Sequence, residues 1–313
     1  MANNTLNGTS AGLPGGLYIF LIALNIFLSI TATLGNALIL VALRKISSIY
    51  PPTKLLFWCL AVTDLCVGLL CQPLDVFFIL ADFRHINYIK DIPSVIHNFF
   101  VDVFFAASAL TSAAITVDRL LALLLGVRYR QVVTLCRVRV LLAWFWFFGV
   151  SNASLFYVAK KLSLSRVLSA SNWTFLGLIL LSIIISTFSY SKIFFTLRHQ
   201  QAQVQGHVQP EQSSTVRSVL NIARYKNTVY SVAWIQFAML ACYGPYIVMA
   251  FLWHFGNVGY STEVMIAGEV FYCLFFLNSS LNPVLYCWRI KDIRQEVKNT
   301  IRKCLCCWVN LQW

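Results

Sequence analysis

Seven apolar segments, each long enough to cross a lipid bilayer, dominate this sequence. A helix rises 1.5 Å per residue, so about 20 apolar residues span the hydrocarbon layer. Of the 313 residues, 59% are hydrophobic and only 11% are charged, which is too apolar for a soluble domain of this length. The pattern predicts an all-α membrane protein with a seven-transmembrane helix bundle. The segments are Leu17–Leu43, Leu55–Leu80, Val95–Leu125, Val140–Ala159, Trp173–Leu197, Val229–Phe255 and Val264–Trp288.

The basic residues predict the orientation of the bundle. The net charge of +13 could suggest a nucleic-acid partner, but Lys and Arg are confined to segments between the apolar runs and mostly to one side. That side is expected to be cytoplasmic, with the N-terminus outside, in a multi-pass protein of the plasma membrane. The expected organisation is an extracellular tail at 1–16, a seven-helix region at 17–288 with its third intracellular loop at about 199–224, and a cytoplasmic amphipathic helix and short tail at 289–313.

Several positions carry signals for covalent modification. Asn3 and Asn7 begin glycosylation motifs in the tail placed outside. After Trp288, apolar residues recur at helical spacing among Lys and Arg, which predicts a basic amphipathic helix on the inner leaflet. Three cysteines close that helix and are candidate palmitoylation sites; a zinc site is the rival interpretation, but the spacing is poor and no histidine is near. These cysteines are Cys304, Cys306 and Cys307.

The remaining cysteines do not predict a disulfide. The chain has ten cysteines, and none lies in a segment assigned to the outside. We therefore expect no extracellular disulfide.

A layer of polar residues is predicted near the middle of the membrane. Asp64 lies about 16 Å from the cytoplasmic end of the second segment, and Ser108 lies at a similar depth in the third. An aspartate at this depth suggests a function. No Lys or Arg is available there, so sodium is the natural partner, although a protonated, purely structural Asp64 stays open. Further members of the layer are Asn36, Asn278, Ser279 and Asn282.

Two further motifs occupy the cytoplasmic halves. Asn278, Asn282 and Tyr286 recur every four residues, so they share one helix face beside Pro283. Asp118 and Arg119 end the third segment. They are either a snorkelling pair or a latch that releases toward a partner.

Together these motifs resemble the rhodopsin-like (class A) G protein-coupled receptors over essentially the whole chain. The resemblance implies that Asp64, Ser108, Asn278 and Ser279 form an allosteric sodium site. It also implies that Arg119 leaves Asp118 to meet a G protein. The matching residues are Gly35–Asn36, Leu60–Leu65, Ser108, Asp118–Arg119, Trp144, Tyr190, Cys242–Pro245 and Asn282–Tyr286; among them, Tyr190 and Tyr286 are the tyrosines expected to swing and Pro245 is the expected kink.

The sequence departs from the family pattern at several positions. Leu120 replaces the tyrosine after Asp-Arg, and Tyr243 replaces the tryptophan before the kink, which leaves a hydroxyl that needs a partner. A cysteine is replaced near Ser94, and Ser182 replaces a proline. The loss of cysteine and proline is loosely most like the melanocortin, lysophospholipid, cannabinoid and adenosine receptor group, and it predicts a freer second extracellular loop at 160–172.

The sequence excludes some classes of ligand but does not identify the ligand. Val101 stands where monoamine receptors carry an aspartate, and Phe276 stands where opsins carry the retinal lysine; a simple monoamine and retinal are therefore disfavoured. Asp75 and Asp102, with Glu269, are candidates to attract a cationic group or calcium, unless they are only solvated helix ends. Outer aromatic residues such as Tyr246 equally suit an apolar ligand, so a basic peptide, a nucleoside and a lipid all remain open.

The sequence therefore predicts a receptor that binds an extracellular ligand and activates heterotrimeric G proteins. No nucleophile–base set, phosphate loop or metal-ligand spacing suggests an enzyme or a bound cofactor other than sodium or calcium. A non-signalling receptor is the alternative, because Leu120 and Tyr243 are altered. A transporter is less favoured, because Asp64 is the one clear ionisable residue at mid-membrane depth.

Overall fold

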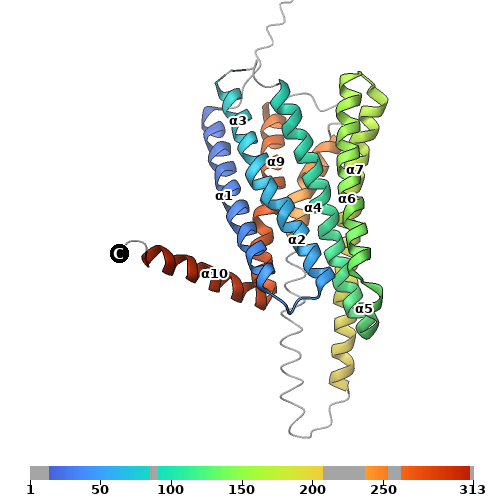
Figure 1. Ribbon diagram of the computed structural model, residues 1–313. Coiled ribbons are helices and arrows are strands. Elements are labelled where there is room, and N and C mark those ends of the chain that lie inside the picture. Colours follow the sequence, from blue (N-terminus) through green and yellow to red (C-terminus); the bar gives the residue numbers. More distant parts are fainter. Residues whose placement is uncertain (1–13, 85, 87–90, 207–236, 253–261, 311–313) are drawn as a thin grey trace, which may run out of the picture.

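A computed structural model describes residues 14–84, 86, 91–206, 237–252 and 262–310, and these contain helices but no strands. The long helices run side by side as a bundle, and the last helix runs across its lower end (Figure 1). The elements are α1 (Gly15–Lys45), α2 (Pro51–Cys66), η1 (Val67–Cys71), α3 (Gln72–Phe83), α4 (Asp91–Leu125), η2 (Gly126–Arg128), α5 (Tyr129–Val132), α6 (Leu135–Lys161), α7 (Ser165–Gly206), α9 (Thr262–Arg289) and α10 (Lys291–Asn310), with a further helix at Phe237–Leu252.

The predicted membrane bundle is confirmed. Six described helices are long and apolar enough to cross a membrane, and α2, η1 and α3 together make one of them. The shorter apolar helix Phe237–Leu252 lies within the predicted sixth segment, whose remaining residues lie outside the described part of the chain. Apolar side chains of α1, α6 and α7 face outward, as the bilayer requires, whereas α4 is the most buried span and packs against α2, α6 and α7.

Helices α1 and α9 approach each other unusually closely. A Cβ atom on Gly35 would lie 2.9 Å from Cγ of Pro283, so the absence of a side chain allows the contact. Polar bonds lie on both sides of it. Asn36 donates to the Ser279 carbonyl at 3.0 Å, and Ser280 donates to the Leu28 carbonyl at 3.0 Å. The Gly35–Asn36 motif thus fixes α1 against the Pro283 region.

The connection between α6 and α7 differs from the sequence prediction. We predicted a free loop at 160–172, but α6 continues to Lys161 and α7 begins at Ser165. Ser163 adopts a left-handed conformation with φ of 54°, and backbone bonds such as Leu164 to Ala159 at 2.9 Å close the turn. The missing disulfide cysteine had predicted a freer loop, but helical and turn backbone hydrogen bonds hold most of this stretch, so the loop prediction was wrong.

Helix α7 is continuous from Ser165 to Gly206. The predicted loss of the family proline explains this, because Ser182 keeps its place in the helix and its hydroxyl donates to the Ile179 carbonyl at 2.7 Å. The helix extends into the stretch 199–224 that we predicted as the third intracellular loop. Residues 207–224 of that stretch lie outside the described chain.

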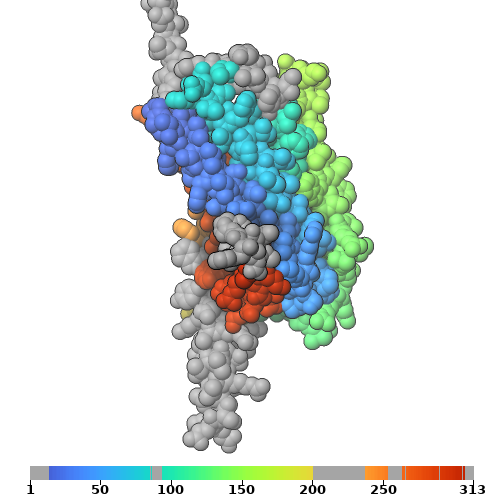
Figure 2. All heavy atoms as spheres, turned by 60° about the vertical axis from the view of Figure 1, so that its left-hand side comes forward, coloured from blue at the N-terminus to red at the C-terminus, as the bar shows by residue number. Residues whose placement is uncertain are grey.

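Helix α10 lies against the lower part of the bundle beside α1 (Figure 2). Its residue Ile293 is fully buried, while Lys45 donates to the Thr300 hydroxyl at 3.1 Å. Cys304 and Cys306 are exposed. The side chain of Cys307, and Asn3 and Asn7, lie outside the described parts, so glycosylation and palmitoylation stay predictions.

Candidate functional site

The polar layer assembles around Asp64 on α2, which is fully buried. Ser108 of α4 donates to Oδ1 of Asp64 at 3.3 Å. Asn282 of α9 donates to Oδ2 at 2.7 Å, and Ser279 lies close to the same carboxylate. Three helices that are distant in sequence therefore converge on one aspartate at mid-membrane depth.

Asn278 belongs to this layer but does not bond to Asp64. Its Nδ2 atom donates to the Tyr243 hydroxyl at 2.8 Å, and Tyr243 is fully buried. This bond supplies the partner that the tyrosine hydroxyl was expected to need. Asn36 likewise donates to backbone carbonyls and not to Asp64.

The chemistry of the layer fits a hard cation. Among the described residues, no Lys or Arg forms an ion pair with Asp64. A carboxylate with hydroxyl and amide oxygens is the ligand set that such cations prefer. Asp64, Ser108 and Ser279 are the residues that would hold sodium, and Asn278 would add its amide oxygen.

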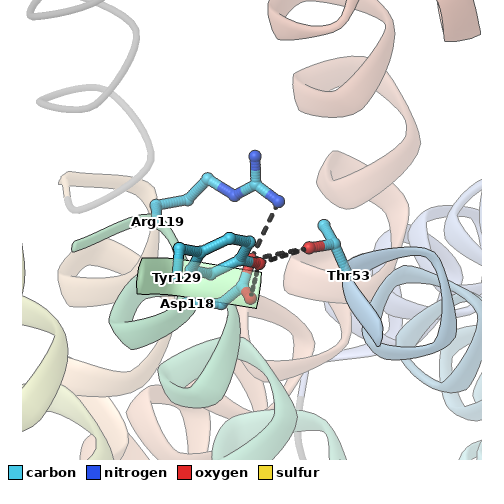
Figure 3. A network of polar contacts seen from close by, with 4 residues as sticks. All are labelled: Thr53, Asp118, Arg119 and Tyr129. Carbon is cyan, nitrogen blue, oxygen red and sulfur yellow. Dashed lines mark hydrogen bonds and ion pairs between the residues drawn. The ribbon is translucent and has the colours of Figure 1, made fainter. Parts of the chain in front are cut away.

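A second polar network lies at the lower end of the bundle (Figure 3). Arg119 donates to Oδ2 of Asp118 at 2.8 Å. Thr53 of α2 donates to the same oxygen at 3.0 Å. Tyr129, the first residue of α5, donates to Oδ1 at 2.6 Å and lies 3.0 Å from the Thr53 hydroxyl. Asp118 is thus a buried acceptor shared by three donors from three elements.

Arg119 also contacts an aromatic pair. Its guanidinium carbon lies 5.9 Å from the Phe57 ring centroid, and Phe57 meets Tyr286 edge-on at 5.0 Å. Tyr190 is buried in a separate small cluster with Leu120 and Ile193. Leu120, which replaces the family tyrosine, therefore packs as a core residue.

Sequence reasoning missed two members of the Asp118 network. Thr53 and Tyr129 lie in segments that we read as a helix start and a basic loop. Neither has a spacing signal, because α2 and α5 meet Asp118 only through the packing of the bundle.

The tryptophan of the fourth segment was matched to the wrong residue of this chain. We assigned the tryptophan of the fourth segment to Trp144, but that side chain is 57% exposed. Trp146 instead packs inward, 6.0 Å from Phe104 between ring centroids, and lies close to Cys59. Two residues on a helix lie about 200° apart, so the apolar run alone could not decide which tryptophan faces inward.

The upper end of the bundle contains an acidic cavity of about 590 Å³. Its residues include Asp75, Asp82, His97 and Glu269, and no Lys or Arg is among the described residues that line it. His97 Nε2 lies 4.0 Å from Asp75 Oδ1, whereas Asp75 Oδ2 has no hydrogen-bond partner among the described residues. Two of the three acids proposed from sequence therefore share this cavity.

A smaller cavity of about 240 Å³ lies beside it and contains the third acid, Asp102, together with Val101, Tyr157 and Lys160. The two cavities share Asn98, Tyr246 and Tyr272. Phe276, which we placed at the ligand site by alignment, is fully buried and lines neither of them.

Packed side chains connect the cavities to the polar layer. Tyr246 contacts Phe275 at a ring-centroid distance of 4.8 Å. Phe275 packs on Phe105 at 4.1 Å and on Tyr243 at 5.0 Å. Because Tyr243 bonds to Asn278, the contact chain reaches the level of Asp64. Pro245, at which a kink is expected, lies in the same helix as Tyr243 and Tyr246.

Metal and disulfide sites are not formed by the part of the chain that the structure describes. No group of three His, Cys, Asp or Glu side chains is arranged to hold a metal ion there, so the calcium prediction gains no support from the two cavities. Nine cysteines are described, and each is a free thiol.

Comparison with known proteins agrees with the motifs. The family described as "7 transmembrane receptor (rhodopsin family)" matches residues 35–286. Similar proteins include trace amine-associated receptor 9 of Rattus norvegicus, 25% identical over 86% of this chain and 83% of the relative. Adenosine receptor A3 of Bos taurus is 24% identical over 96% and 95%. Melanocortin receptor 4 of Danio rerio is 24% identical over 93% and 86%.

Proposed function

Since the chain belongs to the rhodopsin family of seven-transmembrane receptors, we propose that it binds a positively charged extracellular ligand in the acidic cavity and activates heterotrimeric G proteins. Membership of this family makes the chain a multi-pass membrane receptor and not an enzyme. The observation that carries the proposal is the contact chain from the two cavities through Tyr243 to the Asp64 layer.

The basic side chains support the orientation that this function needs. Arg44, Lys45 and the basic residues of α10 lie at the lower end of the bundle, where α1 ends. The positive-inside rule places this end in the cytoplasm. The cavities then open toward the outside of the plasma membrane, and the Asp118–Arg119 pair lies where a G protein would bind.

A cationic group is the ligand chemistry favoured by the cavity. Asp75, Asp82 and Glu269 lie within one cavity, and its described lining residues include His97 but no Lys or Arg. Carboxylates that are removed from water need compensating charge or hydrogen bonds. A ligand with an amine, guanidine or similar group would provide both to Asp75, whereas an uncharged lipid would provide it with neither. Among the ligands left open by the sequence, the cavity favours a basic one.

The switch would act at Arg119. In the present arrangement Asp118 holds the guanidinium at 2.8 Å. A ligand that favours a rearranged helix packing shifts the population toward the state in which Arg119 turns to a partner. Tyr190 and Tyr286 would follow it, and Pro245 would provide the bend. Sodium at Asp64 would favour the opposite state.

The test is G protein activation in cells, across all G protein families, with wild type beside Arg119→Ala. Probes would span small amines, basic peptides, nucleosides and lysolipids, with and without calcium. We expect a basic probe to activate wild type, and Arg119→Ala to abolish activation at equal surface expression. Asp75→Asn should lower probe potency at least tenfold without changing surface expression.

Two results would contradict the proposal. Undiminished signalling by Arg119→Ala would remove the proposed switch. Binding of a basic probe without activation of any G protein would make the chain a non-signalling receptor, the reading that Leu120 and Tyr243 favour.

A further inference from the structure

The two upper cavities form one divided site. They are separate spaces of about 590 and 240 Å³, but both are lined by Asn98 of α4 and by Tyr246 and Tyr272. Tyr246 and Tyr272 both pack against the aromatic residues above Tyr243. A single elongated ligand lying across these three shared residues would reach both cavities.

Within the described part of the chain, each cavity contains a carboxylate that no Lys or Arg pairs with. Asp75 is only 6% exposed, and its Oδ2 atom has no hydrogen-bond partner among the described residues. The same is true of Nε2 of His97, which is 3% exposed. In the smaller cavity, Asp102 makes no hydrogen bond or ion pair within the described chain. The Tyr157 hydroxyl beside it is buried, and no described residue forms a hydrogen bond with it.

Lys160 also lines the smaller cavity, but it does not neutralise Asp102. The Lys160 side chain is exposed, and no ion pair joins the two among the described residues. Lysine carries its charge on a flexible stem that can stay in water. Asp102 therefore still requires a hydrogen-bond donor or a cation, which a ligand could supply.

We propose that the ligand carries two separate cationic nitrogens, one bound by Asp75 with Glu269 and the other by Asp102. The linker between the nitrogens would lie across Asn98, Tyr246 and Tyr272. The Tyr157 hydroxyl would accept a second hydrogen bond from the nitrogen at Asp102. Diamines and compact molecules with two basic groups belong to this class. This inference rests on the proposed function, because it specifies the ligand of the same site.

Val101 and its neighbour Asp102 both line the smaller cavity. The carboxylate of this cavity therefore lies one residue after the position at which monoamine receptors carry their aspartate. A ligand with one nitrogen can satisfy one cavity only. Recognition of the distance between two nitrogens would discriminate against monoamines without any repulsive contact.

The experiment uses the full-length receptor in lipid nanodiscs, and binding is measured by thermal stabilisation, which does not depend on G proteins. The probes are a series of α,ω-diaminoalkanes of increasing chain length, each paired with the monoamine of the same carbon number. The variants are Asp75→Asn and Asp102→Asn. Glu263→Gln is the matched control, because it removes an exposed acid of α9 that lines neither cavity.

We expect one diamine length to bind at least tenfold more tightly than its monoamine. Asp102→Asn should lower the affinity of that diamine to the affinity of the matched monoamine. The affinity of the monoamine itself should not change. Asp75→Asn should lower the affinity of both probes. Glu263→Gln should change the affinity of neither probe by more than about twofold.

The outcomes separate this inference from the proposed function. If monoamines bind through Asp75 and no diamine binds more tightly, the inference of a second cationic nitrogen is wrong. The proposal of a cationic ligand is then still supported. Equal loss of both probes in Asp102→Asn would also overturn the inference, because Asp102 would then act only on the fold. Failure of every amine to bind would overturn both the inference and the proposed cationic ligand.

Discussion

At the scale of single residues, the hydrogen bonds of the Asp118 carboxylate define the arrangement in which Arg119 is held. Thr53, Arg119 and Tyr129 all donate to it, and Asp118 is only 4% exposed. Hydrogen bonds to a buried charged acceptor are each worth on the order of 1.5–3 kcal/mol. The loss of one donor should therefore be measurable.

The first prediction concerns Tyr129→Phe. The change removes the donor to Oδ1 of Asp118 and keeps the ring, so the resting network should weaken. We expect basal G protein activation to rise a few-fold at equal surface expression, in a nucleotide-exchange assay. Tyr50→Phe is the matched control, because Tyr50 packs against Tyr129 at 5.4 Å but does not bond to Asp118. Equal basal activity in all three proteins would show that Tyr129 is structural only.

The second prediction concerns the buried Tyr243–Asn278 bond. Tyr243→Phe leaves Nδ2 of Asn278 buried without its acceptor, at a cost of about 1–3 kcal/mol. The melting temperature of the purified receptor should fall by several degrees. In the double variant Tyr243→Phe with Asn278→Leu, the loss should be smaller than the sum of the two single losses. Additive losses would mean that the two side chains act independently.

At the scale of helices, close packing requires a glycine where two helices come nearest to each other. The contact between α1 and α9 is the clearest example. Gly35 leaves room for Pro283, whose Cγ would lie 2.9 Å from an added Cβ atom. A proline ring within a helix cannot move aside as a flexible side chain can. Overpacking of this kind typically costs about 1–3 kcal/mol.

The third prediction is that Gly35→Ala destabilises the bundle. We expect a lower melting temperature and less protein at the cell surface, measured by thermal unfolding and by surface labelling. Gly177→Ala on α7 is the matched control, since nothing lies within 4 Å of its added Cβ atom. That control should be neutral or stabilising by up to about 1 kcal/mol, because alanine favours helix over glycine. Similar behaviour of the two variants would contradict the tight contact.

At the scale of the whole molecule, the two upper cavities and the Asp118 network lie at opposite ends of the bundle. Asp64 lies between them and is bonded to α4 and α9. A cation that stabilises this arrangement would oppose any ligand that favours another packing. Such coupling is reciprocal between the two binding events.

The fourth prediction is that sodium weakens agonist binding. Replacing sodium with a large organic cation at constant ionic strength should raise the affinity of an activating ligand severalfold in wild type. In Asp64→Asn the same exchange should have no effect, because the charged ligand of the ion is gone. The measurement is competition binding at a series of sodium concentrations. A sodium effect that persists in Asp64→Asn would place the ion elsewhere.

The membrane bundle, the polar layer and the family could be predicted from patterns within single segments of the sequence. Apolar length, basic residues and fixed motif spacing are properties of local segments, and a bilayer converts them directly into spans and depths. Asp64, Ser108 and Asn278 were placed at one level by counting residues. The same counting did not show that Asn278 bonds to Tyr243, because that partner comes from another helix.

Tertiary structure alone decided the remaining contacts. The rotation of each helix about its axis selected Trp146 over Trp144, and a three-residue turn replaced a predicted loop. Packing brought Thr53 and Tyr129 to Asp118, and it divided the acids between two cavities. These outcomes depend on small rotations and side-chain volumes in neighbouring helices, which no single segment encodes.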